Sequence, residues 1–103
     1  MKEVKAYVRP ELVDHVVDVL GLIPGVGGIA VVPVQDYGHV LGDGGLKRTR
    51  MVKLEVDAPN DEVDAVVRAI LENGRSGEGH AGDGSVLVTD VRAAYRIEDG
   101  KPL

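Results

Sequence analysis

The sequence predicts an α+β fold, in which one four-stranded antiparallel sheet carries two helices on a single face. Three observations lead to this prediction. The 103 residues are 44% hydrophobic, which suits one compact domain spanning residues 1–103. Segments with alternating apolar and polar residues, typical of strands, are separated by segments with apolar residues at helical spacing. The order of elements in the first half of the chain then recurs in the second half.

The first half is interpreted as strand, helix, strand. Residues 4–8 alternate apolar with charged or aromatic side chains, as in a strand with one buried face. Pro10 ends this strand, and apolar residues at helical spacing predict a helix over residues 11–23. The apolar residues 29–37 predict a second strand, in which Pro33 requires an edge position or a bulge.

The second half repeats this order after a break. Residues 38–50 contain four glycines and little periodicity, so they predict a long exposed loop, which at this length is often functional. A third strand is expected over residues 52–56 and a second helix over residues 60–71, with Gly74 as its stop. A fourth strand is expected over residues 86–91, followed by a short tail.

A glycine-dense segment, R-S-G-E-G-H-A-G-D-G-S at residues 75–85, leads into the fourth strand; we call it the glycine loop. Gly77, Gly79, Gly82 and Gly84 permit positive φ angles, so several backbone N–H groups can converge on one anion. This pattern predicts a phosphate-bearing ligand. The alternative is a flexible connector, because no Walker-type G-K-[ST] follows the glycines.

An internal repeat determines the order of the strands. V-K-A-Y-V-R-P at residues 4–10 resembles V-K-L-E-V-D-A-P at residues 52–59, and V-D-H-V-V at 13–17 matches V-D-A-V-V at 63–67. Two such halves with right-handed crossovers give the ferredoxin-like arrangement. We expect the second face of the sheet to be covered by self-association, because several apolar strand residues cannot all face the helices. These residues are Val4, Ala6, Val8, Val31, Val52 and Leu54.

Composition excludes several classes of function. The net charge of −5 and the pI near 5.1 argue against binding to nucleic acid or to an anionic membrane. The absence of cysteine removes disulfides, thiolate metal sites and thiol catalysis. No segment is apolar and long enough for a signal peptide or a membrane span, and no catalytic group stands out. We therefore expect a cytoplasmic protein that is not an enzyme and requires no cofactor.

With its elements in this order, the chain resembles the P-II family of nitrogen-regulatory signal transduction proteins over nearly its whole length. Four stretches carry the resemblance: the opening M-K-E-V-K-A-Y-V-R-P, the pair Tyr37-Gly38 at the foot of the family's T-loop, the V-K-L-E-V that leaves this loop, and Gly82-Asp83-Gly84 of the nucleotide-contacting B-loop with its Ser76-Gly77 start. The resemblance implies a homotrimer that binds ATP or ADP between subunits and regulates a transporter or an enzyme through the T-loop.

The resemblance also assigns roles to individual residues. Backbone N–H groups of the G-D-G turn would face the phosphates, the residue at the T-loop base would approach the ligand, and an arginine would reach across from a neighbouring subunit's tail. The implied nucleotide-binding residues are Gly38, Glu55, Gly82, Asp83, Gly84, Ser85 and Arg96. The implied partner-binding residues in the 38–50 loop are His39, Asp43, Lys47, Arg48 and Arg50.

Three positions depart from the family's pattern. Ser85 stands where the family usually has a lysine or arginine, Glu98 where a second arginine is expected, and Val40 where a glutamine is expected. Each charge-assisted hydrogen bond contributes roughly 1.5 to 3 kcal/mol, so the loss of two cations weakens the case for polyphosphate binding. AMP or another small anion is thus an alternative effector. The shortened T-loop also lacks the family's modifiable tyrosine motif, so uridylylation is not expected.

A metal-binding or metal-responsive ferredoxin-like trimer is the alternative function. His39 and Asp43 lie in one loop and His80 and Asp83 in the other, and imidazole with carboxylate suits Zn, Ni or Cu. Their separation in sequence determines no geometry, so His39 and His80 are weak candidates as ligands. A trimer with a purely structural role is a third possibility.

Overall fold

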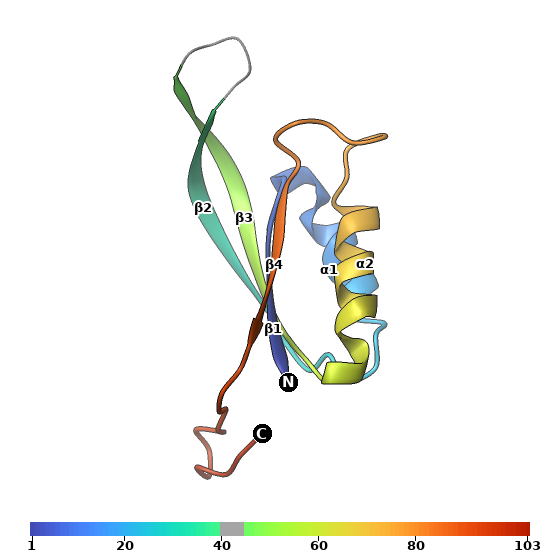
Figure 1. Cartoon of the computed structure of the whole chain (residues 1–103), viewed down its shortest axis with the longest axis vertical. Helices are drawn as coiled ribbons and strands as arrows, with labels where there is room; N and C mark the ends of the chain where they lie inside the picture. The colour runs from blue at the N-terminus through green and yellow to red at the C-terminus, as the bar shows by residue number, and fades with distance from the viewer. Residues whose placement is uncertain (40–44) are drawn as a thin grey trace.

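The structure, a computed structural model, describes residues 1–39 and 45–103, with only the backbone of His39 described. Its four strands form one antiparallel sheet in the order β2-β3-β1-β4, and both helices cover one face of this sheet (Figure 1). The predicted ferredoxin-like fold is therefore confirmed. The elements are β1 Lys2–Val8, α1 Val13–Leu20, β2 Ile29–His39, β3 Leu46–Ala58, α2 Val63–Asn73 and β4 Gly84–Asp90.

Both helices begin with a short 3₁₀ turn, over Pro10–Leu12 before α1 and over Asn60–Glu62 before α2. α1 is shorter than the predicted 11–23, because the chain tightens into i→i+3 hydrogen bonds after Leu20 and reaches Pro24, which has no N–H to continue the helix. Gly74 ends α2 as predicted, and its N–H donates to the Ile70 carbonyl at 2.7 Å. Neither helix in the described part of the chain is long and apolar enough to cross a membrane.

The helices and the sheet enclose an aliphatic core. The strand register places Ala6 opposite Leu54 and Val8 opposite Val52, and directly opposite side chains share a face of the sheet. These four residues and Val4 are buried or packed against the core beneath the helices. Val31, opposite Leu54, lies on the same face but is 48% exposed. The expectation that such residues cannot all face the helices is therefore wrong, because one alternating set from each strand supplies this face.

The other face of the sheet, which we call the open face, is polar at its centre. Lys5 Nζ lies 3.3 Å from Glu3 Oε1, and Lys53 Nζ lies 2.9 Å from Glu55 Oε1. The mutual hydrogen bond raises the pKa of Lys53 and lowers the pKa of Glu55. Leu87, which is opposite Lys5 in the register and 48% exposed, is an apolar residue of this face. Any self-association through the open face would bring paired charges as well as apolar side chains into the contact.

Strands β2 and β3 continue beyond β1 as a two-stranded ribbon, in which residues 35–39 pair with residues 46–50 (Figure 1). Pairing between them runs to His39 opposite Leu46, and the prediction of a loop over 38–50 is wrong at both ends because residues 38–39 and 46–50 are strand. Both sides of this ribbon are exposed to solvent, so its residues carry no apolar alternation that reveals a strand. Pro33 lies in edge strand β2 as predicted, with unbroken pairing and hence no bulge.

Candidate functional site

The glycine loop connects α2 to β4 at one end of the sheet. Its four glycines have the positive φ angles that the sequence predicts, from 57° at Gly77 to 116° at Gly84. The loop is closed by its own hydrogen bonds: Gly79 N–H donates to the Ser76 carbonyl at 2.9 Å, and Asp83 N–H donates to the His80 carbonyl at 3.1 Å. The glycines therefore form a turn that its own backbone hydrogen bonds close.

The carboxylate of Asp83 is hydrogen-bonded within this turn. It accepts hydrogen bonds from the backbone N–H of His80 at 2.8 Å and of Ser76 at 3.2 Å, and also from the Ser76 hydroxyl. These bonds are typical of a loop that binds an anion through converging N–H groups. The anion that the glycine loop holds is thus one of its own side chains.

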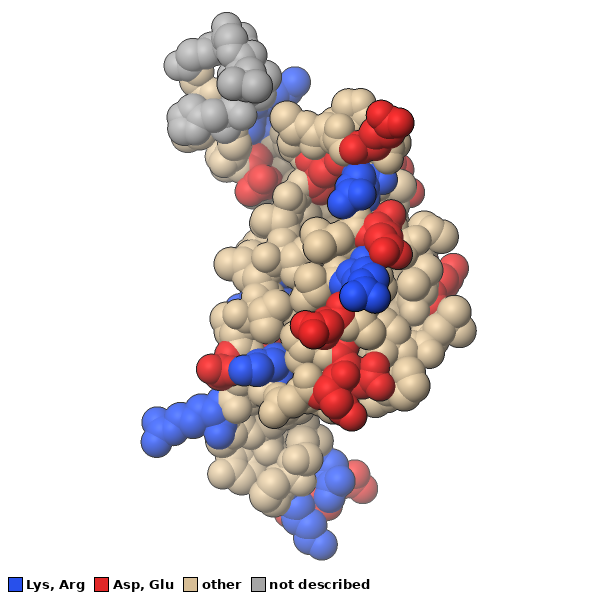
Figure 2. Space-filling view, turned by 45° about the vertical axis from the view of Figure 1, so that its right-hand side comes forward, with Lys and Arg blue, Asp and Glu red and all other residues tan. Residues whose placement is uncertain are grey.

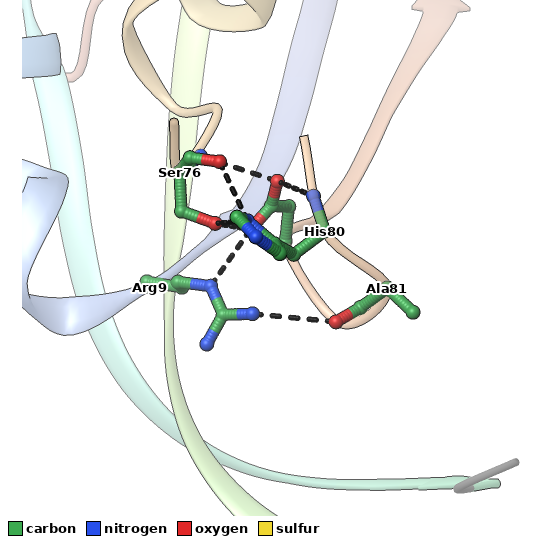
Figure 3. Close-up of polar contacts among 5 residues, drawn as sticks. Arg9, Ser76, His80 and Ala81 are labelled. Carbon is green, nitrogen blue, oxygen red and sulfur yellow. Dashed lines mark hydrogen bonds and ion pairs between the residues drawn. The ribbon is translucent and has the colours of Figure 1, made fainter. Parts of the chain in front are cut away.

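Arg9, the residue after β1, ties the glycine loop to the sheet. Its Nε donates to Asp83 Oδ1 at 2.8 Å and its Nη2 donates to the Ala81 carbonyl at 3.3 Å (Figure 3). The two charged side chains are only 28% and 17% exposed, so this ion pair is less screened than one on an open surface. The sequence analysis did not predict this role of Arg9. The Arg9-Pro10 pair at the end of the first strand was noted only as part of the family resemblance.

The His80 ring is hydrogen-bonded to Ser76, and among the described residues it forms no hydrogen bond with the Asp83 carboxylate. Its ring Nδ1 lies 2.7 Å from the carbonyl oxygen of Ser76, and since a carbonyl only accepts, Nδ1 carries the proton. Within the described residues no group of three His, Asp or Glu side chains could hold a metal ion. The other predicted ligands, the His39 side chain and Asp43, lie outside the described residues.

Several N–H groups of the glycine loop remain for an external ligand. The backbone N–H groups of Gly77, Glu78, Ala81 and Gly82 have no hydrogen-bond acceptor among the described residues, and all four residues are exposed. The backbone N–H of Asp83, which we predicted to face a phosphate, instead donates to the His80 carbonyl. The turn therefore offers these four N–H donors to an external ligand, while the Asp83 carboxylate takes the N–H groups of Ser76 and His80.

Ser85 directly follows the G-D-G turn on β4, whereas the other three predicted nucleotide-binding residues lie outside the glycine loop. Arg96 is in the tail, at the opposite end of β4 from the G-D-G turn (Figure 1). β4 has seven residues, so at about 3.3 Å each it separates the two by roughly 20 Å. Glu55, midway along the pairing of β3 with β1, lines a hollow of about 920 Å³ together with Ile29 and the tail residue Leu103. Gly38 lies in the β2–β3 ribbon. The G-D-G turn and Arg96 therefore do not meet within one chain.

The predicted partner-binding residues in the described part of the chain all lie on the ribbon. Lys47, Arg48 and Arg50 are exposed, and none forms an ion pair with another described residue. Arg48 is opposite Tyr37 in the register, and Arg50 is opposite Gln35. By contrast, the helix side of the molecule mixes basic and acidic side chains without a continuous patch of either sign (Figure 2). With these three basic residues against one acidic residue, Asp36, among its described residues, the ribbon carries a net positive charge in an acidic chain.

The fold and the glycine loop define a class of protein: a ferredoxin-like α+β domain with an ordered, anion-holding turn and a projecting two-stranded ribbon. The family model "Nitrogen regulatory protein P-II" matches residues 1–101. The chain is 33% identical to nitrogen regulatory protein P-II of Haemophilus influenzae and 32% identical to P-II 1 of Methanothermobacter thermautotrophicus, in each case over 98% of this chain and over 95% and 92% of the relative. It is 31% identical to P-II 1 of Escherichia coli over 98% of this chain and 95% of that protein. The chain thus belongs to the P-II family of nitrogen-regulatory signal transduction proteins.

Replacing Asp83 by Asn is expected to open the glycine loop. Hydrogen bonds from the Ser76 hydroxyl, the His80 N–H and Arg9 hold the pKa of Asp83 well below its ordinary value. Because the pKa is lowered on folding, the carboxylate stabilises the loop fully at pH values above its ordinary pKa. This stabilisation is lost as the pH falls toward and through the pKa of the folded state. In Asp83→Asn we expect the Ser76 and His80 amides to exchange about tenfold faster or more at neutral pH, measured by hydrogen exchange.

The pH dependence gives this prediction its control. The wild-type loop should lose protection only in acid, below about pH 4, whereas the loop of Asp83→Asn should show no such transition. Asp90→Asn, at the far end of β4 where the carboxylate pairs with Lys2, should leave both loop amides protected. Unchanged exchange of the Ser76 and His80 amides in Asp83→Asn would show that the carboxylate does not hold the turn.

Proposed function

We propose that the protein is a P-II signal transduction protein that acts as a homotrimer and binds a small anionic effector in the clefts between subunits. The effector is an adenine nucleotide, ATP, ADP or AMP. Binding regulates a partner, a membrane transporter or an enzyme, through the β2–β3 ribbon. We expect the protein to work in the cytoplasm and to have no catalytic activity of its own.

The observation that carries this proposal is the shape of the glycine loop. Asp83 and Arg9 hold the turn in one conformation, and the exposed N–H groups of Gly77, Glu78, Ala81 and Gly82 remain available to phosphate oxygens. A site that is ordered before the ligand arrives loses less conformational entropy on binding. The wild-type loop is therefore suited to an anionic ligand although Ser85 brings no positive charge.

The distance between the glycine loop and Arg96 supports a site shared between subunits. Roughly 20 Å of strand β4 separates them within one chain. A second subunit in a closed ring can place its tail beside the first subunit's loop, and repetition of this contact gives identical sites. The polar centre of the open face, with the Lys5–Glu3 and Lys53–Glu55 pairs, suits a contact that is partly electrostatic.

The ribbon suits an acidic partner surface. Arg48 and Arg50 are two residues apart on one strand, so their side chains project from the same side about 7 Å apart. Arginine pairs well with carboxylates because its planar guanidinium can donate two parallel hydrogen bonds. The ribbon's positive charge, in a chain with a net charge of −5, favours a target that presents Asp or Glu side chains.

Titration calorimetry with ATP, ADP, AMP and bicarbonate tests the effector. We expect at least one adenine nucleotide to bind and Arg96→Ala to weaken its binding about tenfold, the effect of one charge-assisted contact. Arg92→Ala, which removes an exposed arginine of the same tail, is the matched control and should change the affinity little. Sedimentation should give three times the chain mass of 10.9 kDa. No heat with any nucleotide, together with a particle of one chain, would reject the proposal.

A further inference from the structure

The tail after β4 folds into a turn of its own. Arg96 N–H donates to the Lys101 carbonyl at 2.9 Å, and Gly100 N–H donates to the Arg96 carbonyl at 2.8 Å. Tyr95 and Pro102 form an isolated antiparallel bridge that closes the turn. The turn stands away from the helices, at the opposite end of the molecule from the glycine loop (Figure 1). Its conformation is therefore determined by contacts between nearby residues of the tail.

Inside this turn the Arg96 guanidinium already has an anionic partner. Its Nε donates to Asp99 Oδ1 at 3.3 Å, and its Nη2 donates to Asp99 Oδ2 at 3.1 Å. The Lys101 backbone N–H donates to Asp99 Oδ1 at 2.9 Å, so the carboxylate is held from two sides. These bonds, first that from Lys101 and then that from Arg96, lower the pKa of Asp99. Figure 2 shows acidic and basic side chains next to each other on the tail.

This two-bond geometry is the one in which arginine binds phosphate. A guanidinium recognises a carboxylate or a phosphate through two parallel N–H donors, and Asp99 occupies the Nε and Nη2 donors of Arg96. The side chains of Arg96 and Asp99 are 47% and 34% exposed, so the pair is accessible to solvent and can open. An incoming phosphate therefore meets an arginine that is neutralised but not buried.

We propose that Asp99 is a built-in counter-ion that competes with the anionic effector for Arg96. The inference rests on the proposed function, because it concerns the same nucleotide site. In the free protein the guanidinium is paired within its own tail, and effector binding transfers it from the Asp99 carboxylate to a phosphate. Asp99 thus lowers the affinity for phosphate-bearing ligands and couples the shape of the tail to the occupancy of the site.

Asp99→Asn tests the proposal by calorimetry on the full-length protein. Asn can still accept the N–H of Lys101, so the turn is retained while the competing charge is lost. We expect ATP and ADP to bind roughly three- to tenfold more tightly, the range set by an exposed ion pair. Adenosine, which has no phosphate, should bind the variant and the wild type equally. The double variant Arg96→Ala/Asp99→Asn should bind ATP no more tightly than Arg96→Ala does.

Asp90→Asn is the matched control, because it removes the same charge from another exposed ion pair, the one with Lys2, which does not involve Arg96. We expect it to change the ATP affinity less than twofold. Hydrogen exchange of the Gly100 amide checks that the turn persists. If Asn disturbs the turn, Asp99→Ser, whose hydroxyl can also accept the Lys101 N–H, replaces it.

The possible results separate this inference from the proposed function. If the wild type binds ATP and Asp99→Asn binds it equally, or if Asp90→Asn gives the same gain, Asp99 is not a specific competitor although the nucleotide function stands. If only Asp99→Asn binds ATP, the counter-ion role is supported. If neither the wild type nor Asp99→Asn binds any nucleotide, both the proposed function and the inference are overturned.

Discussion

Gly84→Ala is expected to destabilise the protein by about 3 kcal/mol or more, the sum of backbone strain and a steric clash. Gly84 has φ +116°, which an L-residue rarely adopts, and a Cβ at this position would overlap with the carbonyl oxygen of Tyr7 on the neighbouring strand β1. The same Cβ would lie 3.3 Å from Cε of the buried Met51. Backbone and core must both shift to make room. Urea unfolding at one fixed protomer concentration measures the loss.

Two other glycines separate the causes of this loss. A Cβ on Gly82 would be 3.6 Å from the nearest atom, on Arg9, so Gly82→Ala should suffer only from its φ of +88°, at about 1 to 2 kcal/mol. Gly27 has no positive φ and no atom within 4 Å of such a Cβ, so Gly27→Ala should be neutral or slightly stabilising. Equal stability of Gly84→Ala and Gly27→Ala would mean that β1 and β4 do not approach as described.

This close approach also has a functional side. Gly84 is the first residue of β4 and the last glycine of the G-D-G turn, next to Asp83. Because only glycine allows β4 to pair with β1 directly after the turn, it determines where the glycine loop lies relative to Arg9. The glycine pattern that suggests anion binding in the sequence is thus partly a requirement of strand pairing.

Elements with one buried face were predictable from the sequence, because burial creates the alternation or the helical spacing that reveals them. The strand over residues 4–8 and the helix from Val63 are of this kind. The outer part of the ribbon was not predictable from the sequence. Residues 46–50 are exposed on both faces, so they show no alternation of apolar and polar side chains. The repeat was sufficient for the topology, because few right-handed arrangements of two such halves exist.

The glycine loop was predictable in position and in backbone conformation but not in what fills it. Its anion is Asp83, and the cation that holds this carboxylate is Arg9, 74 positions earlier in the chain. No spacing rule connects two such residues, because their distance depends on how β1 and β4 pair. The Arg96–Asp99 pair is local, three residues apart, yet only the structure shows that the tail turns back on itself.

Leu54→Ala tests which face of the sheet holds the core, and it is expected to cost about 2 to 5 kcal/mol. Leu54 is fully buried beneath the helices, opposite Ala6 on β1 and Val31 on β2. A domain of this size has a total stability of about 5 to 15 kcal/mol, so the variant loses a large fraction of it. Urea unfolding with an unchanged slope would show that stability, and not the extent of the fold, has changed.

Leu87→Ala is the matched control, because it removes the same atoms from the open face. Leu87 is 48% exposed, and its truncation should cost no more than about 1 kcal/mol in the folding of one subunit. If the open face is covered in a trimer, however, the loss caused by Leu87→Ala should depend on protomer concentration, whereas the loss caused by Leu54→Ala arises within the subunit. Similar, concentration-independent losses in the two variants would contradict both the assignment of the helix face and the proposed covering of the open face.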